Sequence, residues 1–140
     1  MSGQYVLIDS SVPLYALGAP SLWREACQEL LRGLAEERLR AVASTEMIQE
    51  VVHHRLRMTG DRVVAVTNAR DLIALVDVAP FDEAVLRTAL GLIETGTVRG
   101  RDAVHAATAL TRGITTIVST DPAFDDVPGL KRLDPLDYGD

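Results

Sequence analysis

Short apolar segments alternate with longer amphipathic segments along this chain of 140 residues. The short segments are rich in β-branched residues, which is typical of buried strands, and the long ones repeat apolar residues at helical spacing. The predicted strands are 5–9, 40–43, 74–78, 115–119 and 131–133. Strands separated by helices need right-handed crossovers, so the pattern predicts an α/β fold whose parallel sheet carries helices on both faces.

The helices between these strands are expected over 10–17, 20–38, 45–58, 62–72, 82–96 and 101–112. Ser44 or Thr45 is expected to cap the third helix and Asp61 the fourth, because short polar side chains are favoured at N-caps. A turn is predicted over 121–124, and 131–133 is expected to be an edge strand. The length suggests one domain over 1–140, and 47% hydrophobic residues are enough for a real core.

The single cysteine, Cys27, rules out an internal disulfide bond and lies in a predicted amphipathic helix, where a small buried hydrophobe is expected. The N-terminal apolar run follows no basic segment and is too short to cross a membrane. A cytoplasmic location without membrane contact is therefore the default expectation.

Four acidic residues stand where predicted strands give way to helices. Asp9 and Asp121 end two apolar runs, and Asp102 and Glu50 fall in the first turns of two helices. Ligands of parallel α/β sheets bind at the carboxyl ends of the strands. Acids that converge there repel one another unless a cation joins them, so the pattern predicts a divalent metal site. With no other catalytic signature in the chain, this points to phosphodiester hydrolysis.

Each of these acids also has a structural interpretation. Asp9 and Asp102 could cap helices, and Asp121 could form a turn before a proline. Glu46 shares a helix face with Glu50, but acids in a first turn favour the helix dipole, which explains Glu46 more readily. We therefore assign the ligand role to Glu50 and a supporting or solvated role to Glu46.

Further polar residues surround these positions in the sequence. Ser119 and Thr120 could contact a ligand or hold a water beside it, and Asp125 is a candidate for the same supporting role. Asp126 is an additional candidate, and both aspartates also suit a solvated turn. His105, one turn after Asp102, is expected to be a partly buried, hydrogen-bonded histidine and not a metal ligand, since a hard cation prefers oxygen ligands.

Several enzyme classes are excluded by missing motifs. The chain has no P-loop, and its one lysine, Lys131, is misplaced for such a loop. It has no glycine-rich dinucleotide motif after the first strand and no G-x-S-x-G elbow. Ser10 and Ser11 follow Asp9, so the Asp-x-Asp pair of haloacid-dehalogenase-like phosphatases is absent as well.

Four segments in order resemble those of PIN-domain ribonucleases, most closely the VapC-type toxins of bacterial toxin–antitoxin pairs. The segments are Val6-Leu-Ile-Asp-Ser-Ser11, Ser44-Thr-Glu-Met-Ile-Gln-Glu-Val51, Arg101-Asp-Ala-Val-His-Ala-Ala-Thr-Ala-Leu110 and Ile117-Val-Ser-Thr-Asp-Pro-Ala-Phe124. The third segment is the most specific, and Val127-Pro-Gly-Leu130 follows the fourth as in the family.

This resemblance implies a three-layer α/β/α PIN-like fold with a central, mostly parallel sheet of four to five strands. It implies an endoribonuclease that depends on Mg²⁺ or Mn²⁺, with Asp9, Glu50, Asp102 and Asp121 as metal ligands and catalytic residues. It also implies a homodimer and a small VapB-like antitoxin as partner.

A net charge of −6 does not suit a general nucleic-acid binder, although a bound cation would offset the acid cluster. Arginines near the predicted site are the candidates for RNA contact, because their fork geometry suits phosphate. They are Arg55, Arg57, Arg99 and Arg101. A second interpretation stays open: a catalytically weak PIN-like binding module that acts through a partner protein.

Overall fold

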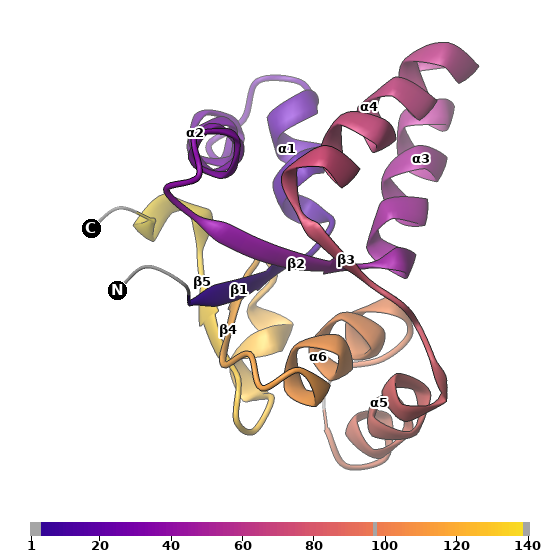
Figure 1. Cartoon of the computed structure of the whole chain (residues 1–140), viewed down its shortest axis with the longest axis vertical. Helices are drawn as coiled ribbons and strands as arrows, with labels where there is room; N and C mark the ends of the chain where they lie inside the picture. The colour runs from indigo at the N-terminus through magenta and orange to yellow at the C-terminus, as the bar shows by residue number, and fades with distance from the viewer. Residues whose placement is uncertain (1–3, 97, 139–140) are drawn as a thin grey trace.

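One parallel sheet forms the centre of the molecule (Figure 1). A computed structural model gives the structure of residues 4–96 and 98–138. The strands are β1 (Tyr5–Ile8), β2 (Arg40–Ser44), β3 (Asp77–Ala79), β4 (Thr116–Val118) and β5 (Lys131–Leu133). They lie in the order β3-β2-β1-β4-β5, and every pairing is parallel. The predicted parallel sheet of four to five strands, with β5 at an edge, is confirmed.

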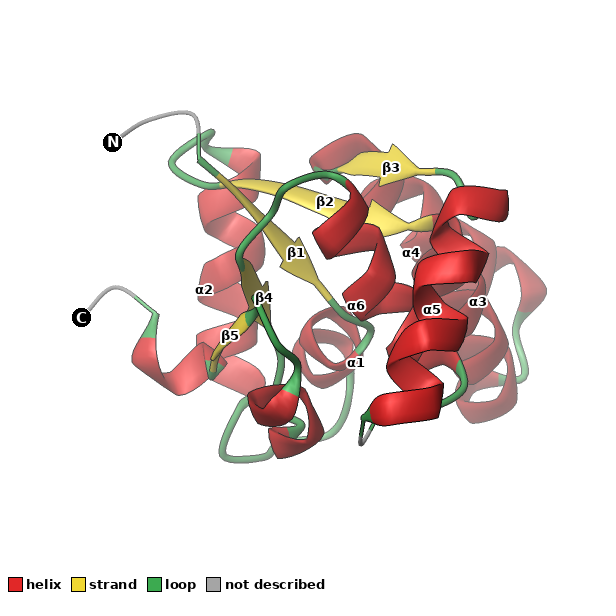
Figure 2. Ribbon diagram, turned by 90° about the horizontal axis from the view of Figure 1, so that it is seen from below, coloured by secondary structure: helices red, strands yellow, loops and turns green. Residues whose placement is uncertain are grey.

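Helices cover both faces of this sheet, which gives the predicted three layers. The helices are α1 (Ser11–Leu17), α2 (Arg24–Ala35), α3 (Thr45–Thr59), α4 (Arg62–Leu75), α5 (Glu83–Thr95) and α6 (Arg101–Thr111). The first four lie on one side, and α5 and α6 lie on the other, where Figure 2 shows them in front of the sheet. None of these helices has the length and hydrophobicity of a membrane span.

Two hydrophobic cores result, one on each face. Successive strand residues point to opposite faces, so Leu7 joins the core under α5 and α6 and Ile8 joins the core under α1 to α4. Because the sheet is covered on both sides, its inner strands are largely apolar, as expected for a buried parallel sheet, whereas the edge strands β3 and β5 carry charged residues. Cys27 is fully buried in the second core, and burial raises the pKa of its thiol to about 12. The prediction that Cys27 is a small buried hydrophobe is confirmed.

Side-chain caps fix the starts of α3 and α4. The Ser44 hydroxyl accepts a hydrogen bond from the Met47 amide at 3.0 Å, so Ser44 and not Thr45 caps α3. Asp61 caps α4 as predicted, accepting from the Val63 and Val64 amides at 2.9 and 3.1 Å.

The predicted bounds of α2 were wrong at both ends. The helix begins at Arg24 because Ser21 forms a local turn, its hydroxyl accepting from the Trp23 amide at 3.3 Å. It ends at Ala35 because Glu37 adopts a left-handed conformation with φ of 60°, which turns the chain toward β2.

The strand predicted over 74–78 was also wrong in part. α4 continues to Leu75, and β3 covers only Asp77–Ala79. Ala74 and Leu75 are strong helix formers, so the helix persists until the extended Val76. At the other end of the chain, the turn predicted over 121–124 is a 3₁₀ helix, η1 (Pro122–Asp126), and a second one, η2 (Pro135–Asp137), follows β5.

Candidate active site

Asp9 lies at the carboxyl end of β1, where it is almost completely buried. Its amide donates to the Val118 carbonyl of β4 at 3.3 Å, which fixes the backbone. Its carboxylate accepts from the Ser11 hydroxyl at 2.5 Å, from the Ser11 amide at 3.1 Å and from the Ser119 hydroxyl at 2.8 Å. Burial raises the pKa of Asp9, although the hydrogen bonds from both serines oppose the shift. The carboxylate is therefore held in place by its hydrogen bonds, and burial opposes its ionisation.

Asp102 lies in the first turn of α6, two residues after Gly100, whose φ of 58° lets the backbone turn into the helix. Burial raises the pKa of Asp102 to about 6, and the nearby His105 opposes this shift. The negative charges of three other acids raise the pKa further; these acids are Asp121, Asp9 and Glu50. The four predicted carboxylates therefore share one electrostatic neighbourhood.

Asp121 follows β4 and caps η1. Its Oδ1 accepts from the Ala123 amide at 2.9 Å, and its own amide donates to the Ser119 hydroxyl at 3.0 Å. Asp121 thus caps η1, and it also lies close enough to Asp102 to raise the pKa of that residue. Ser119 joins Asp9 to Asp121, which is the supporting position expected for it.

Glu50 is held by a buried histidine. Its Oε1 lies 2.7 Å from His105 Nε2, and its Oε2 lies 3.7 Å from the Arg101 guanidinium. His105 is fully buried on α6, and its Nδ1 lies 3.0 Å from the Ser44 hydroxyl. That hydroxyl also accepts from the Met47 amide, so the His105 ring links the start of α3 to the Glu50 carboxylate. His105 is hydrogen-bonded, as predicted, although it is fully and not partly buried, and it orients the Glu50 side chain.

The alternative acid, Glu46, is not among the residues that raise the Asp102 pKa, and it does not line the pocket described next. Glu50 itself also lies outside the wall of that pocket, because its carboxylate turns toward His105 and Arg101. Sequence position alone could not show this orientation.

A pocket of about 580 Å³ opens at the carboxyl end of the sheet. Its acidic end is formed by Asp9, Asp102 and Asp121, with Ser11 and Thr120 beside them. The Thr120 amide donates to the Ser11 hydroxyl at 3.2 Å, which ties the loop after β4 to the start of α1. The rest of the lining is mostly apolar and comes from Leu14, Tyr15, Gly18, Ala19, Pro20, Ser21, His54 and Met58.

The donor chemistry of the acidic end fits a hydrated divalent cation. Among the residues that the structure describes, no three His, Cys, Asp or Glu side chains are arranged to hold a metal by themselves. The reason is that Asp9 faces its two serines and Glu50 faces His105. Mg²⁺ keeps several waters and needs only one or two direct carboxylates. The carboxylates of Asp9, Asp102 and Asp121 therefore suit Mg²⁺ or Mn²⁺ held largely through water.

Two of the predicted supporting and RNA-binding residues are engaged elsewhere. Asp125 pairs with Arg132 through contacts of 2.8 and 3.3 Å and does not line the pocket. Arg55 donates to Asn68 at 3.1 Å and to the Leu17 carbonyl at 3.3 Å, which joins α3 to α4 and α1. Arg57 and Arg99 are exposed, as contact with RNA requires.

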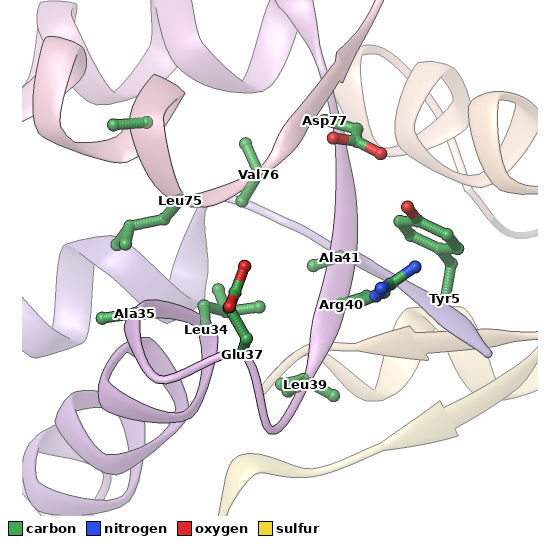
Figure 3. Close-up of a pocket in the computed structure, with 11 residues that line it drawn as sticks. Tyr5, Leu34, Ala35, Glu37, Leu39, Arg40, Ala41, Leu75, Val76 and Asp77 are labelled. Carbon is green, nitrogen blue, oxygen red and sulfur yellow. The ribbon is translucent and has the colours of Figure 1, made fainter. Parts of the chain in front are cut away.

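A second pocket, of about 470 Å³, lies at the opposite edge of the sheet (Figure 3). Tyr5, Arg40 and Asp77, the first residues of β1, β2 and β3, line it, and Arg40 lies 6.0 Å from the centre of the Tyr5 ring. None of the four predicted acids contributes to it. We therefore place the chemistry at the carboxyl edge and not here.

The sequence analysis did not assign three contacts of this site. They are the hydrogen bond of Ser11 to Asp9, the contact of Ser44 with His105, and the contact by which His105 orients Glu50. Ser11 stands two residues after Asp9, a spacing at which serine and aspartate commonly pair locally. His105 stands three residues after Asp102 and so shares its helix face. The Ser44–His105 contact joins residues 61 positions apart, and no local pattern indicates it.

Fold and site together define a parallel α/β protein with an acidic, oxygen-donor site at the carboxyl edge of its sheet. Residues 6–130 match the family model of the PIN domain. Ribonuclease VapC7 of Mycobacterium tuberculosis is 36% identical over 133 residues, which are 93% of this chain and 91% of that protein. Ribonuclease VapC13 of the same organism is 34% identical over 131 residues, 91% and 98% of the two chains. The chain belongs to the PIN domain family.

Solved structures show the same fold. VapBC2 from Rickettsia felis, bound to a DNA fragment from its promoter, superposes with a TM-score of 0.71 at 14% identity, covering 94% of this chain and 98% of that one. VapC20 of Mycobacterium tuberculosis, a toxin that cleaves the sarcin–ricin loop, gives a TM-score of 0.68 at 17% identity, covering 84% and 90%.

Proposed function

We propose that this chain is an endoribonuclease that hydrolyses RNA phosphodiester bonds with Mg²⁺ or Mn²⁺, and that it is the toxin of a type II toxin–antitoxin pair. The observation that carries the proposal is the gathering of Asp9, Asp102 and Asp121 around one pocket, with Glu50 in the same electrostatic field. Relatives named as VapC ribonucleases over nearly the whole chain support it. The proposed site of action is the cytoplasm, where the RNA substrate lies.

In this mechanism the protein supplies a rigid set of oxygen donors. Ser11 and Ser119 fix the Asp9 carboxylate, and His105 fixes the Glu50 carboxylate. A bound divalent cation would supply the positive charge that lets these acids ionise together and that polarises water and phosphate. Without it, Asp102, with its pKa of about 6, holds a proton in part of the molecules near neutral pH. The acids would therefore bind the cation more tightly as the pH rises.

Cleavage of total bacterial RNA by the purified protein, with Mg²⁺ or Mn²⁺ and with an EDTA control, tests this function. Asp9→Asn keeps the shape of the side chain and removes a charged donor. We expect a fall in kcat on the order of 10²-fold or more, because metal-ion stabilisation of the transition state is worth several kcal/mol. Asp71→Asn, on the exposed surface of α4, is the matched control and should cleave like the wild type. Equal cleavage by Asp9→Asn would contradict the mechanism.

The proposed partners are RNA, a small VapB-like antitoxin and a second copy of this chain. The resemblance in fold to toxin–antitoxin complexes such as VapBC2 supports the antitoxin. Co-expression with the product of an adjacent small reading frame should yield a complex without ribonuclease activity. Sedimentation equilibrium of the chain alone measures whether it dimerises.

A further inference from the structure

The pocket at the carboxyl edge continues past the acids into a wall of different chemistry. Leu14 and Tyr15 of α1 and Met58 of α3 line this end, together with Pro20 of the loop before α2. The Tyr15 ring packs against Trp23 with centroids 5.1 Å apart, which holds it in place. One cavity thus joins hard oxygen donors to an apolar, partly aromatic surface. A phosphate alone would use only its acidic end.

His54 adds a polar ring to this mostly apolar wall. Its side chain is half-buried, and its Nδ1 is shielded from solvent without a hydrogen-bond partner. Burial lowers the pKa of His54, and the charges of Arg57, Arg55 and His53 lower it further. The ring is therefore neutral at neutral pH and offers one donor and one acceptor. A polar nitrogen left without a hydrogen-bond partner is unusual, and His54 lines the pocket that a ligand would enter.

We propose that this apolar end binds the nucleobase next to the scissile phosphate, and that His54 selects the base by hydrogen-bonding to its edge. The inference rests on the proposed ribonuclease function and extends it. A nucleotide joins its phosphate to a flat aromatic base through one sugar, so a phosphate at the acids places a base along the same cavity. Proteins that read single-stranded RNA stack bases on aromatic or apolar side chains and bond to their edges. The wall supplies both elements.

The first test needs no cleavage. Trp23 is the single tryptophan and contacts Tyr15, so its fluorescence reports occupancy of the wall. The four nucleoside 5′-monophosphates are titrated in the presence of Mg²⁺. We expect saturable binding with unequal affinities, weakened on the order of tenfold by His54→Phe, which keeps a flat ring and removes both nitrogens. His53→Phe, on the exposed side of the same helix, is the matched control and should bind like the wild type.

The second test is cleavage of a randomised RNA pool with sequencing of the fragment ends. The wild type should prefer certain bases at one position beside the cut, and His54→Phe should lose the preference there, with a raised KM and little change in kcat. Met58→Ala should raise KM without altering the preference; this side chain is 66% exposed, so its loss spares the fold.

Three results would overturn the subsite. Equal binding of all four mononucleotides by wild type and His54→Phe would do so, as would an unchanged base preference in the variant. The third is loss of antitoxin capture by His54→Phe with normal nucleotide binding, which would assign the wall to the partner protein. If the wild type binds mononucleotides selectively but cuts no RNA, the subsite stands and the proposed hydrolysis fails.

Discussion

The charge of Asp102 destabilises the metal-free protein. Its pKa is about 6 in the folded chain and 3.8 ordinarily, so the folded state binds the proton more tightly than the unfolded state. The stability of the metal-free protein should therefore fall as the pH rises from about 4 to about 6, and stay lower above that range. The raised pKa of Asp9 acts in the same direction.

Asp102→Asn removes one of these charges. In EDTA at pH 8, we expect a higher thermal midpoint for the variant than for the wild type, and at pH 4 equal midpoints. Mg²⁺ should raise the wild-type midpoint more than that of the variant, because a ligand stabilises the state that binds it. Equal thermal midpoints of wild type and variant at pH 8 in EDTA would show that the charge of Asp102 does not destabilise the folded protein.

The positions of the four acids could be predicted from the sequence, but the orientations of their side chains could not. Asp9, Asp102 and Asp121 were predictable because each stands at a strand end or in a first helical turn, where backbone geometry leaves little choice. The orientations of Glu50 and Asp125 depend on their partners in the fold. The first turns toward His105 and the second toward Arg132, and both partners lie on other elements. Tertiary contacts of this kind leave no local pattern in a sequence.

The capping side chains of α3 and α4 differ in the other contacts that they make. Ser44 caps α3 and also contacts the buried His105, whereas Asp61 caps α4 at the surface. Asp61→Ala should lower the free energy of unfolding by about 1 kcal/mol, the usual worth of a cap. Ser44→Ala should lower it by about 2–4 kcal/mol, because a buried histidine nitrogen also loses its partner. Urea denaturation at equal m-value measures both. Equal losses would mean that the Ser44–His105 contact contributes nothing.

The elements themselves were predictable to the extent that local chemistry decides them. The cap at Asp61 and the strand β1 were predicted from local sequence, and the structure confirms both. α2 was placed too long at both ends, because the turn at Ser21 and the left-handed Glu37 depend on few residues. β3 was confused with the end of α4, since an apolar run such as Ala74–Leu75 suits either a buried helix or a strand.

On the scale of the whole molecule, an acidic chain must bind a polyanion. The net charge is −6, and four of the acids gather at the proposed site, so the approach of RNA depends on cations around the rim. Arg55 is engaged within the protein, and Arg101 lies near Glu50. Arg57 and Arg99 are therefore the better candidates for phosphate contacts.

Arg99→Gln and Arg57→Gln test this arrangement one charge at a time. Each lost phosphate contact should raise KM and make the slope of log(kcat/KM) against log salt shallower by about 0.7, the value for single-stranded nucleic acid. Because an arginine at the rim acts on encounter and not on the reacting atoms, kcat should change little. Arg87→Gln is the control, since Arg87 is exposed on α5 and already pairs with Glu83 at 2.7 Å. If both variants show the same salt dependence of kcat/KM as the wild type, these arginines do not contact RNA. The binding energy would then come from contacts inside the pocket.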